Sequence, residues 1–205
     1  MVKGIGSILS ISVGFSHACA VRVDGALFCW GDDTDGDLGI DSTYVTTAPA
    51  QVPLSHVVQV AAGGSHTCAL VRTGVVYCWG DNGYGQLGTG SKAHDSLVPV
   101  RVRKLPVAVA IATGENHTCV VLKSGVLQCW GDNVFGQLGD GTTSSSSVPR
   151  TVRGLAHVMK VSSGGSHTCA LLATGESECW GYGYFGQLGD GREVNTSVPV
   201  TVAFK

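Results

Sequence analysis

Short apolar segments alternate with glycine-rich polar segments along the whole chain. The pattern is plainest where an apolar run over 57–62 ends at a Gly-Gly pair, two β-rich runs over 66–71 and 75–79 flank a glycine-containing turn, and a run over 98–102 carries a proline. None of these runs keeps a 3.6-residue apolar period between helix caps, so no helix is expected. The pattern predicts four short strands, and the proline suits an edge strand because it cannot donate to a sheet ladder.

This four-strand unit occurs four times. A histidine in H-x-C, a tryptophan in C-W-G and a proline before the last apolar run each return about every 50 residues. The markers are His17, His66, His117 and His167; Trp30, Trp79, Trp130 and Trp180; and Pro49, Pro99, Pro149 and Pro199. Such repetition predicts an all-β propeller with one blade of four antiparallel strands per repeat. We expect a single repeat domain over 1–205, with blades at about 5–54, 55–105, 106–155 and 156–204.

The turn between the second and third strands of each unit sets the strand register. Its glycine is Gly25, Gly74, Gly125 or Gly175. A two-residue type I′ loop would also need φ > 0 at the preceding residue, which the β-branched Thr73 resists. We therefore expect a three-residue loop in which glycine alone is left-handed, and this register places Cys68 directly opposite Cys78. The same register pairs Cys19 with Cys29, Cys119 with Cys129, and Cys169 with Cys179.

Paired cysteines in every repeat predict four disulfides. Directly opposed residues of antiparallel strands have the Cα separation that a disulfide needs. A buried thiol that serves only as a small hydrophobe would be expected singly rather than in four pairs. Disulfides imply an extracellular or otherwise oxidising compartment. Because the first residues lack an apolar run and a cleavage site, we expect a mature chain whose signal peptide has been removed.

The segments G-G-S-H-T-C-A-L, C-W-G-D-N and G-Q-L-G-D-G resemble the repeats of the regulator of chromosome condensation family over about residues 5 to 204. The resemblance implies a propeller, usually of seven blades, that acts as a protein-binding platform. Known members include a nuclear exchange factor, a plant ultraviolet photoreceptor and a secreted β-lactamase inhibitor. This chain departs from the family pattern in having four repeats and in carrying paired cysteines in every repeat.

Charge and hydropathy narrow the range of partners. Charged residues make up 14% of the chain and the formal net charge is −2, which argues against binding to nucleic acid or to an acidic membrane surface. No apolar run reaches the length needed to span a membrane. We expect a protein partner.

Two repeated side chains have both a chemical and a structural interpretation. Four histidines on a propeller axis could gather a metal, but they recur with glycine and cysteine neighbours, so we interpret each as a partly buried ring that bonds backbone within its own blade. The C-W-G tryptophans are interpreted as packing between blades. The photoreceptor of the family gathers its sensing tryptophans just before H-T, where this chain has none, for example at Gly64-Ser65.

An acidic loop and one sequon remain as candidate sites. The loop contains Asp32, Asp33, Asp35 and Asp37. Carboxylates on a bent loop suit Ca²⁺, but the D-x-D-x-D-G spacing is not met and no glutamate follows, so we expect a solvated acidic loop, with calcium as the alternative. Asn195, in N-T-S, lies in a polar loop and is a candidate for glycosylation.

The sequence therefore predicts a non-catalytic binding module without a cofactor. The stretches that differ most among repeats are 40–48, 89–97, 140–147 and 190–197, and we expect them to form the binding surface. Four blades of a seven-bladed curvature would span about 200° and leave two apolar faces uncovered. A structural protein that assembles head to tail into a ring or filament is therefore the main rival interpretation. The repeated histidines and tryptophans also leave open a metal-dependent enzyme and a light sensor.

Overall fold

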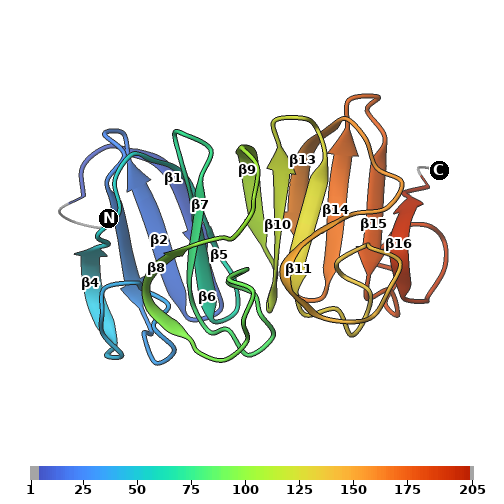
Figure 1. Cartoon of the computed structure of the whole chain (residues 1–205). Helices are drawn as coiled ribbons and strands as arrows, with labels where there is room; N and C mark the ends of the chain where they lie inside the picture. Colours follow the sequence, from blue (N-terminus) through green and yellow to red (C-terminus); the bar gives the residue numbers. More distant parts are fainter. Residues whose placement is uncertain (1–4, 204–205) are drawn as a thin grey trace.

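The computed structural model describes residues 5–203. This part of the chain contains no helix, and so no helix able to cross a membrane. It forms four separate antiparallel sheets of four strands each, and each sheet is built from consecutive strands. The sheets stand side by side in chain order from blue to red (Figure 1), and they do not close into a ring. The expected all-β array of four propeller blades is confirmed.

Each sheet is one blade. Blade 1 contains β1 (Ile8–Val13), β2 (His17–Arg22), β3 (Leu27–Gly31) and β4 (Thr46–Gln51). Blade 2 contains β5 (Val57–Ala62), β6 (His66–Val71), β7 (Val76–Gly80) and β8 (Ser96–Arg101). Blade 3 contains β9 (Ala108–Thr113), β10 (His117–Leu122), β11 (Leu127–Gly131) and β12 (Ser146–Thr151). Blade 4 contains β13 (Val158–Ser163), β14 (His167–Leu172), β15 (Ser177–Gly181) and β16 (Thr196–Thr201).

The tight turns between the second and third strands share one geometry. In blade 2, the Val71 N–H donates to the Val75 carbonyl at 3.0 Å, and Gly74 lies at φ +83°. Only glycine adopts that backbone region without steric cost. The register that follows puts Cys68 opposite Cys78 and Thr67 opposite Trp79. Blades 3 and 4 repeat both pairings, and blade 1 repeats the cysteine pair but has Ala18 opposite Trp30.

The first strand of every blade lines the inner side of the array, and the fourth strand is the outer edge. β5 packs against both β1 and β2, and β9 and β13 make the same contacts with the blades before them. The prolines of the outer strands, such as Pro99 in β8, lie where the ladder has a free edge. The inner strands therefore set the curvature, and the outer strands with the loops before them reach the rim.

The apolar core lies between blades rather than within one blade. The cluster between blades 1 and 2 joins Cys19, Leu27 and Leu38 of blade 1 to Val57 and Trp79 of blade 2. Equivalent clusters fill the next two junctions. These three clusters show the packing logic of a repeat protein, and a fourth, smaller cluster lies within blade 1, where Ile5 packs on Ala20 and Phe28.

Candidate functional site

The repeat histidines join neighbouring blades. The Nε2 atoms of His17, His66 and His117 lie 2.8, 3.0 and 2.8 Å from threonine hydroxyls of the following blade, those of Thr67, Thr118 and Thr168. The expectation of a backbone partner within the same blade was wrong for these three. The ring packs closely on its own blade's glycine, as His66 does on Gly63, where an added Cβ would lie 2.5 Å from Cε1 of the ring. That contact directs Nε2 across the junction.

The hydrogen bonds define the protonation state of these rings. Each threonine hydroxyl also lies close to a main-chain carbonyl of the preceding blade, as Thr67 does to Asp37 at 2.8 Å. The hydroxyl donates its single proton there, so it accepts from Nε2–H of the neutral ring. Burial lowers the pKa of His17 to about 4 and the pKa values of His66 and His117 to about 3. At neutral pH these rings are uncharged connectors between blades.

The tryptophans complete the same junctions. The indole N–H groups of Trp79, Trp130 and Trp180 donate to the carbonyls of Asp37, Gln86 and Gln137 at 2.9, 2.8 and 2.9 Å. These are the carbonyls that the threonines also use. All three indoles are fully buried. Trp30 of β3 is partly exposed, because it lies on the face of blade 1 that no other described blade covers. Their interpretation as packing residues agrees with this placement.

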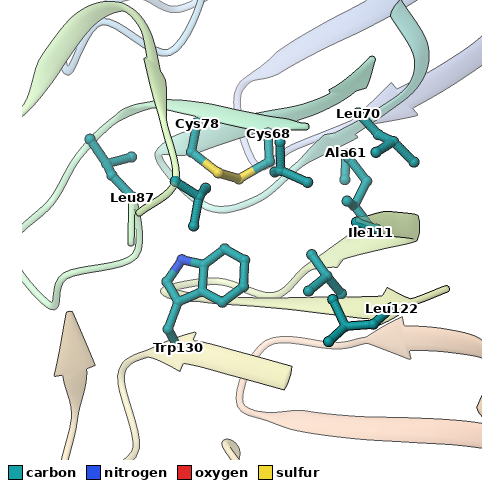
Figure 2. Close-up of a cluster of buried hydrophobic side chains, with 12 residues drawn as sticks. Ala61, Cys68, Leu70, Cys78, Leu87, Ile111, Leu122 and Trp130 are labelled. Carbon is teal, nitrogen blue, oxygen red and sulfur yellow. A yellow bond between two sulfur atoms is a disulfide. The ribbon is translucent and has the colours of Figure 1, made fainter. Parts of the chain in front are cut away.

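All eight cysteines lie in the predicted pairs, and the four disulfides each join residues separated by 10 positions with Cα atoms 4.1 Å apart. Each disulfide in an internal junction faces the tryptophan of the following blade. Figure 2 shows the Cys68–Cys78 bond above the indole of Trp130. The bond therefore locks a hairpin and also forms part of the surface on which the next blade packs.

The acidic loop of blade 1 differs from the expectation of a solvated loop. Asp32 and Asp35 are partly exposed, but the side chains of Asp33 and Asp37 are buried, at 0% and 2% exposed. They occupy the positions of Asn82 and Gln86 in the next blade, as the aligned loop sequences show. The expectation was wrong for these two because the loop packs against blade 2, where Gly36 meets Leu97.

Few hydrogen bonds offset the burial of the Asp33 and Asp37 carboxyl groups. Among the described residues, one oxygen of each, Asp33 Oδ2 and Asp37 Oδ1, has no hydrogen-bond partner. Burial first, and then the negative charges of Asp35 and Asp32, raise the pKa of Asp37 to about 7. Within residues 5–203, no three His, Cys, Asp or Glu side chains are grouped closely enough to hold a metal ion. The loop thus buries two carboxyl groups at positions where blades 2 and 3 have two amides and blade 4 has Gly183 and Gln187.

The loops before the outer strands combine a fixed base with variable side chains. The Asn82 amide donates to the carbonyls of Ser91 and His94 at 3.1 Å, and Asn133 holds the loop of blade 3 in the same way. Outward-facing residues differ: blade 1 presents Tyr44 and Val45, which are 80% and 66% exposed. The candidate binding surface consists of these four variable loops, 40–48, 89–97, 140–147 and 190–197.

The sequon asparagine takes part in this loop framework. The Asn195 side-chain oxygen accepts a hydrogen bond from the Gly183 N–H at 3.0 Å, the position that Asp95 fills for Asn82. Asn195 is partly exposed. The amide nitrogen is the atom that would carry a glycan.

Sequence reasoning missed the threonine that follows the repeat histidine. It occurs in three repeats as H-T-C, and blade 1 has Ala18 instead. The recurrence itself was a visible signal, but its meaning depends on a partner about 50 residues away in the preceding blade. Nothing local to the strand predicts that contact.

The fold and its junctions define an open β-propeller array of disulfide-locked blades. Residues 2–205 match the family model described as an RCC1-like domain, and the chain belongs to that family. It is 36% identical over 140 residues to the probable E3 ubiquitin-protein ligase HERC3 of Homo sapiens, a match that covers 65% of this chain and 13% of that protein. It is 48% identical over 141 residues to the X-linked retinitis pigmentosa GTPase regulator of Mus musculus, over 66% of this chain and 14% of the relative.

Solved structures show the same fold. Human WBSCR16 superposes with a TM-score of 0.91 at 25% identity, and the match covers all of this chain and 55% of that one. Yeast RCC1 (Prp20), solved with Kap60, superposes with a TM-score of 0.84 at 23% identity and is covered over 49% of its length. The chain therefore spans about half the length of these solved proteins and a much smaller share of the curated relatives.

Proposed function

We propose that this chain is a non-catalytic protein-binding module that contacts its partner through the variable loops. The carrying observation is the contrast within the loops of blades 2 and 3. Buried amides such as Asn82 and Asn133 hold the loop backbone in one shape, while the exposed side chains change from blade to blade. A rigid scaffold that presents variable loops is a common design for recognition surfaces. The RCC1-like fold supports this role.

Blade 1 offers the most apolar part of this surface. Tyr44 and Val45 stand next to each other and are largely exposed. An aromatic ring and an adjacent aliphatic group on an exposed loop are suited to anchor a partner. The double variant Tyr44→Ser/Val45→Ser removes the anchor, and the amide framework that holds the loops of blades 2 and 3 is left untouched.

The test is quantitative cross-linking capture from the native source by three proteins: the wild type, the Tyr44→Ser/Val45→Ser variant and a Val23→Ser control. Val23 is 59% exposed and lies in the turn after β2, at the opposite end of the blade. We expect one partner to be captured by the wild type and the control and lost from the double variant. Equal capture by all three proteins would refute binding at the loops.

A second candidate function is head-to-tail self-association. Ile11 on β1 is 63% exposed, whereas its counterpart Val60 on β5 is 3% exposed because blade 1 covers it. At the other end of the array, Cys169 and Leu171 of blade 4 are partly exposed, on the side that faces a following blade in every internal junction. Ile5 already covers Ala20 and Phe28 of blade 1, and a second copy can cover the groups that stay exposed at the two ends, because they are of complementary types.

Sedimentation equilibrium over a wide concentration range tests this second candidate. Association predicts an average mass that rises above the 21.1 kDa of the single chain as concentration increases. A mass that stays at the single-chain value up to about 100 μM, a concentration at which an interface with micromolar affinity is populated, would exclude it.

We further infer that the protein works in an oxidising compartment outside the cell or in a secretory organelle. The four disulfides support this placement, since cytosolic thiols are kept reduced. Fractionation of the source organism should find the protein in the medium or in a secretory fraction. If the source glycosylates secreted proteins, Asn195→Gln should abolish a mass increment on the chain.

Two measurements on protein from the native source test the remaining alternatives. Elemental analysis tests for a metal-dependent enzyme, and an absorption spectrum tests for a light sensor. A stoichiometric transition metal would favour the enzyme. Reversible light-induced spectral changes would favour the sensor.

A further inference from the structure

Three internal junctions share one set of contacts, which we call the junction set. The trailing face of each blade, the side that meets the following blade, supplies a histidine Nε2–H, a loop carbonyl, a disulfide and a main-chain N–H. The leading face of the following blade supplies a threonine hydroxyl, an indole and a main-chain carbonyl. Between blades 2 and 3, for example, Gly64 N–H donates to the Glu115 carbonyl at 3.0 Å beside the His66–Thr118 contact.

The trailing face of blade 4 has every group of the junction set. His167, the Gln187 carbonyl, the Cys169–Cys179 disulfide and the Gly165 N–H occupy the repeat positions. Within residues 5–203, no side-chain hydrogen bond engages His167. An added Cβ on Gly186 would meet nothing within 4 Å, whereas on Gly136 it would lie 2.6 Å from Ser197 of the next blade. Within residues 5–203, this face has every group of the junction set and no further blade covers it.

The leading face of blade 1 has only part of the set. Trp30 is present and lies directly opposite Ala18 in the β2–β3 register, as Trp79 lies opposite Thr67. Ala18 has no hydroxyl. A blade placed before it would therefore find an indole donor for its carbonyl but no acceptor for its histidine N–H.

A further contact at the rim occurs only in the junction between blades 3 and 4, because Asp81 and Asp132 stand at the position of Tyr182 in the other internal junctions. In the junction between blades 3 and 4, the Phe135 ring packs edge-to-face on Tyr182, with ring centroids 4.9 Å apart. Phe185 is the counterpart of Phe135 and is 84% exposed. The counterpart of Tyr182 in blade 1 is Asp32, which is partly exposed and offers no ring. Contact between the two ends therefore lacks this aromatic pair too.

We propose that the trailing face of blade 4 binds the leading face of blade 1 in a second copy of the chain, and that Ala18 makes this junction weak and reversible. The proposal rests on the self-association put forward above and specifies its interface and its strength. Trp30 of one copy donates to the Gln187 carbonyl of the other and covers the Cys169–Cys179 disulfide. His167 keeps a buried N–H without an acceptor, which costs binding free energy.

Ala18→Thr should repair this junction. Threonine fits the same strand position in blades 2, 3 and 4, and β-branched residues favour strands. The new hydroxyl accepts from His167 Nε2–H and donates to the Gln187 carbonyl of the neighbouring copy. Two added hydrogen bonds should lower the dissociation constant by about tenfold to thirtyfold. Because the expected effect is a gain in affinity, a variant that merely fails to fold cannot produce it.

Sedimentation equilibrium of five proteins provides the test: the wild type, Ala18→Thr, Ala48→Thr, Trp30→Phe, and Ala18→Thr combined with His167→Ala. Ala48 is exposed on the outer strand β4, so Ala48→Thr is the matched control and should leave the dissociation constant unchanged. Trp30→Phe keeps a ring but removes the indole donor and should weaken association by about threefold to tenfold. His167→Ala should cancel most of the gain produced by Ala18→Thr.

The outcomes separate this proposal from the one on which it rests. Tighter association in Ala18→Thr alone, lost again with His167→Ala, would support the junction. Association of the wild type that neither Ala18→Thr nor Trp30→Phe alters would show that copies meet elsewhere, which overturns the junction but leaves self-association intact. No association of the wild type or of Ala18→Thr at about 100 μM would overturn both.

Discussion

Trp79 donates its indole N–H to the main-chain carbonyl of Asp37 at 2.9 Å, across the junction between blades 1 and 2. The tryptophan belongs to one repeat and the carbonyl to the repeat before it. Because the same contact recurs between the other adjacent blades, each repeat depends on its neighbour for the burial of its largest side chain. The stability of such an array is a sum of blade and junction contributions.

The buried carboxyl group of Asp37 lowers the stability of this junction at neutral and alkaline pH. Its pKa is about 7, compared with 3.8 for an ordinary aspartate, so the folded chain holds a proton on Asp37 between those pH values while the unfolded chain does not. Stability contributed by this group is present below about pH 4 and is lost as the pH rises to about 7. Asp37→Gln, which installs the residue of the other blades, should stabilise the protein by about 2 kcal/mol at pH 8 and by little at pH 4.

Urea denaturation at the two pH values measures this difference. Asp41→Asn is the control, because Asp41 is exposed in the same loop region. An equal effect of Asp37→Gln at pH 4 and pH 8 would show that folding does not raise the pKa of Asp37.

Two glycines with the same backbone geometry allow the cost of backbone strain in the turn to be measured apart from the cost of a clash with the next blade. Gly74 and Gly175 lie at φ +83° and +89° in equivalent turns. An added Cβ on Gly74 would come within 2.5 Å of Val107 at the start of the next blade, whereas one on Gly175 would meet nothing within 4 Å. Gly175→Ala should cost about 1 kcal/mol from backbone strain alone, and Gly74→Ala about 3 kcal/mol or more because a clash is added.

Chemical denaturation of both variants gives the two free energies of unfolding. Similar costs would mean that the turn after β6 does not press on blade 3. A larger cost for Gly175→Ala would contradict the arrangement of the blades.

The disulfides should be present in the protein as isolated. Alkylation after denaturation without reductant should find no free thiol, and alkylation after reduction should find eight. Reduction should lower stability, by up to about 2–3 kcal/mol per bond, because each bond closes a short hairpin loop that the turn already restricts. Eight thiols without reductant would remove the basis for placing the protein in an oxidising compartment.

The strands, their turns and the cysteine pairs could be predicted because local chemistry decides them. Thr73 before Gly74 excludes a two-residue loop, and the remaining register places Cys68 opposite Cys78. The partners of the histidines could not be predicted in this way. His66 bonds Thr118, and a blade-to-blade contact depends on how two sheets pack rather than on neighbours in sequence.

The burial of Asp33 and Asp37 was missed for the same reason. Their loop has the composition of a solvated loop, and only the approach of blade 2 against Gly36 and Gly39 encloses it. Where local pattern and packing between blades disagree, packing decides, because the three largest core clusters lie between blades.

The central claim is that, within residues 5–203, three junctions between blades are closed and no further blade covers either end face, and ¹⁹F NMR of protein labelled with 5-fluorotryptophan tests it most directly. Trp79, Trp130 and Trp180 are fully buried in junctions, whereas Trp30 is partly exposed on the leading face of blade 1. In dilute solution we predict three resonances insensitive to exchange of H₂O for D₂O and one sensitive resonance, assigned by Trp30→Phe. Four equally shielded resonances at the lowest concentration would contradict the account, because they would require blade 1 to be covered within a single chain.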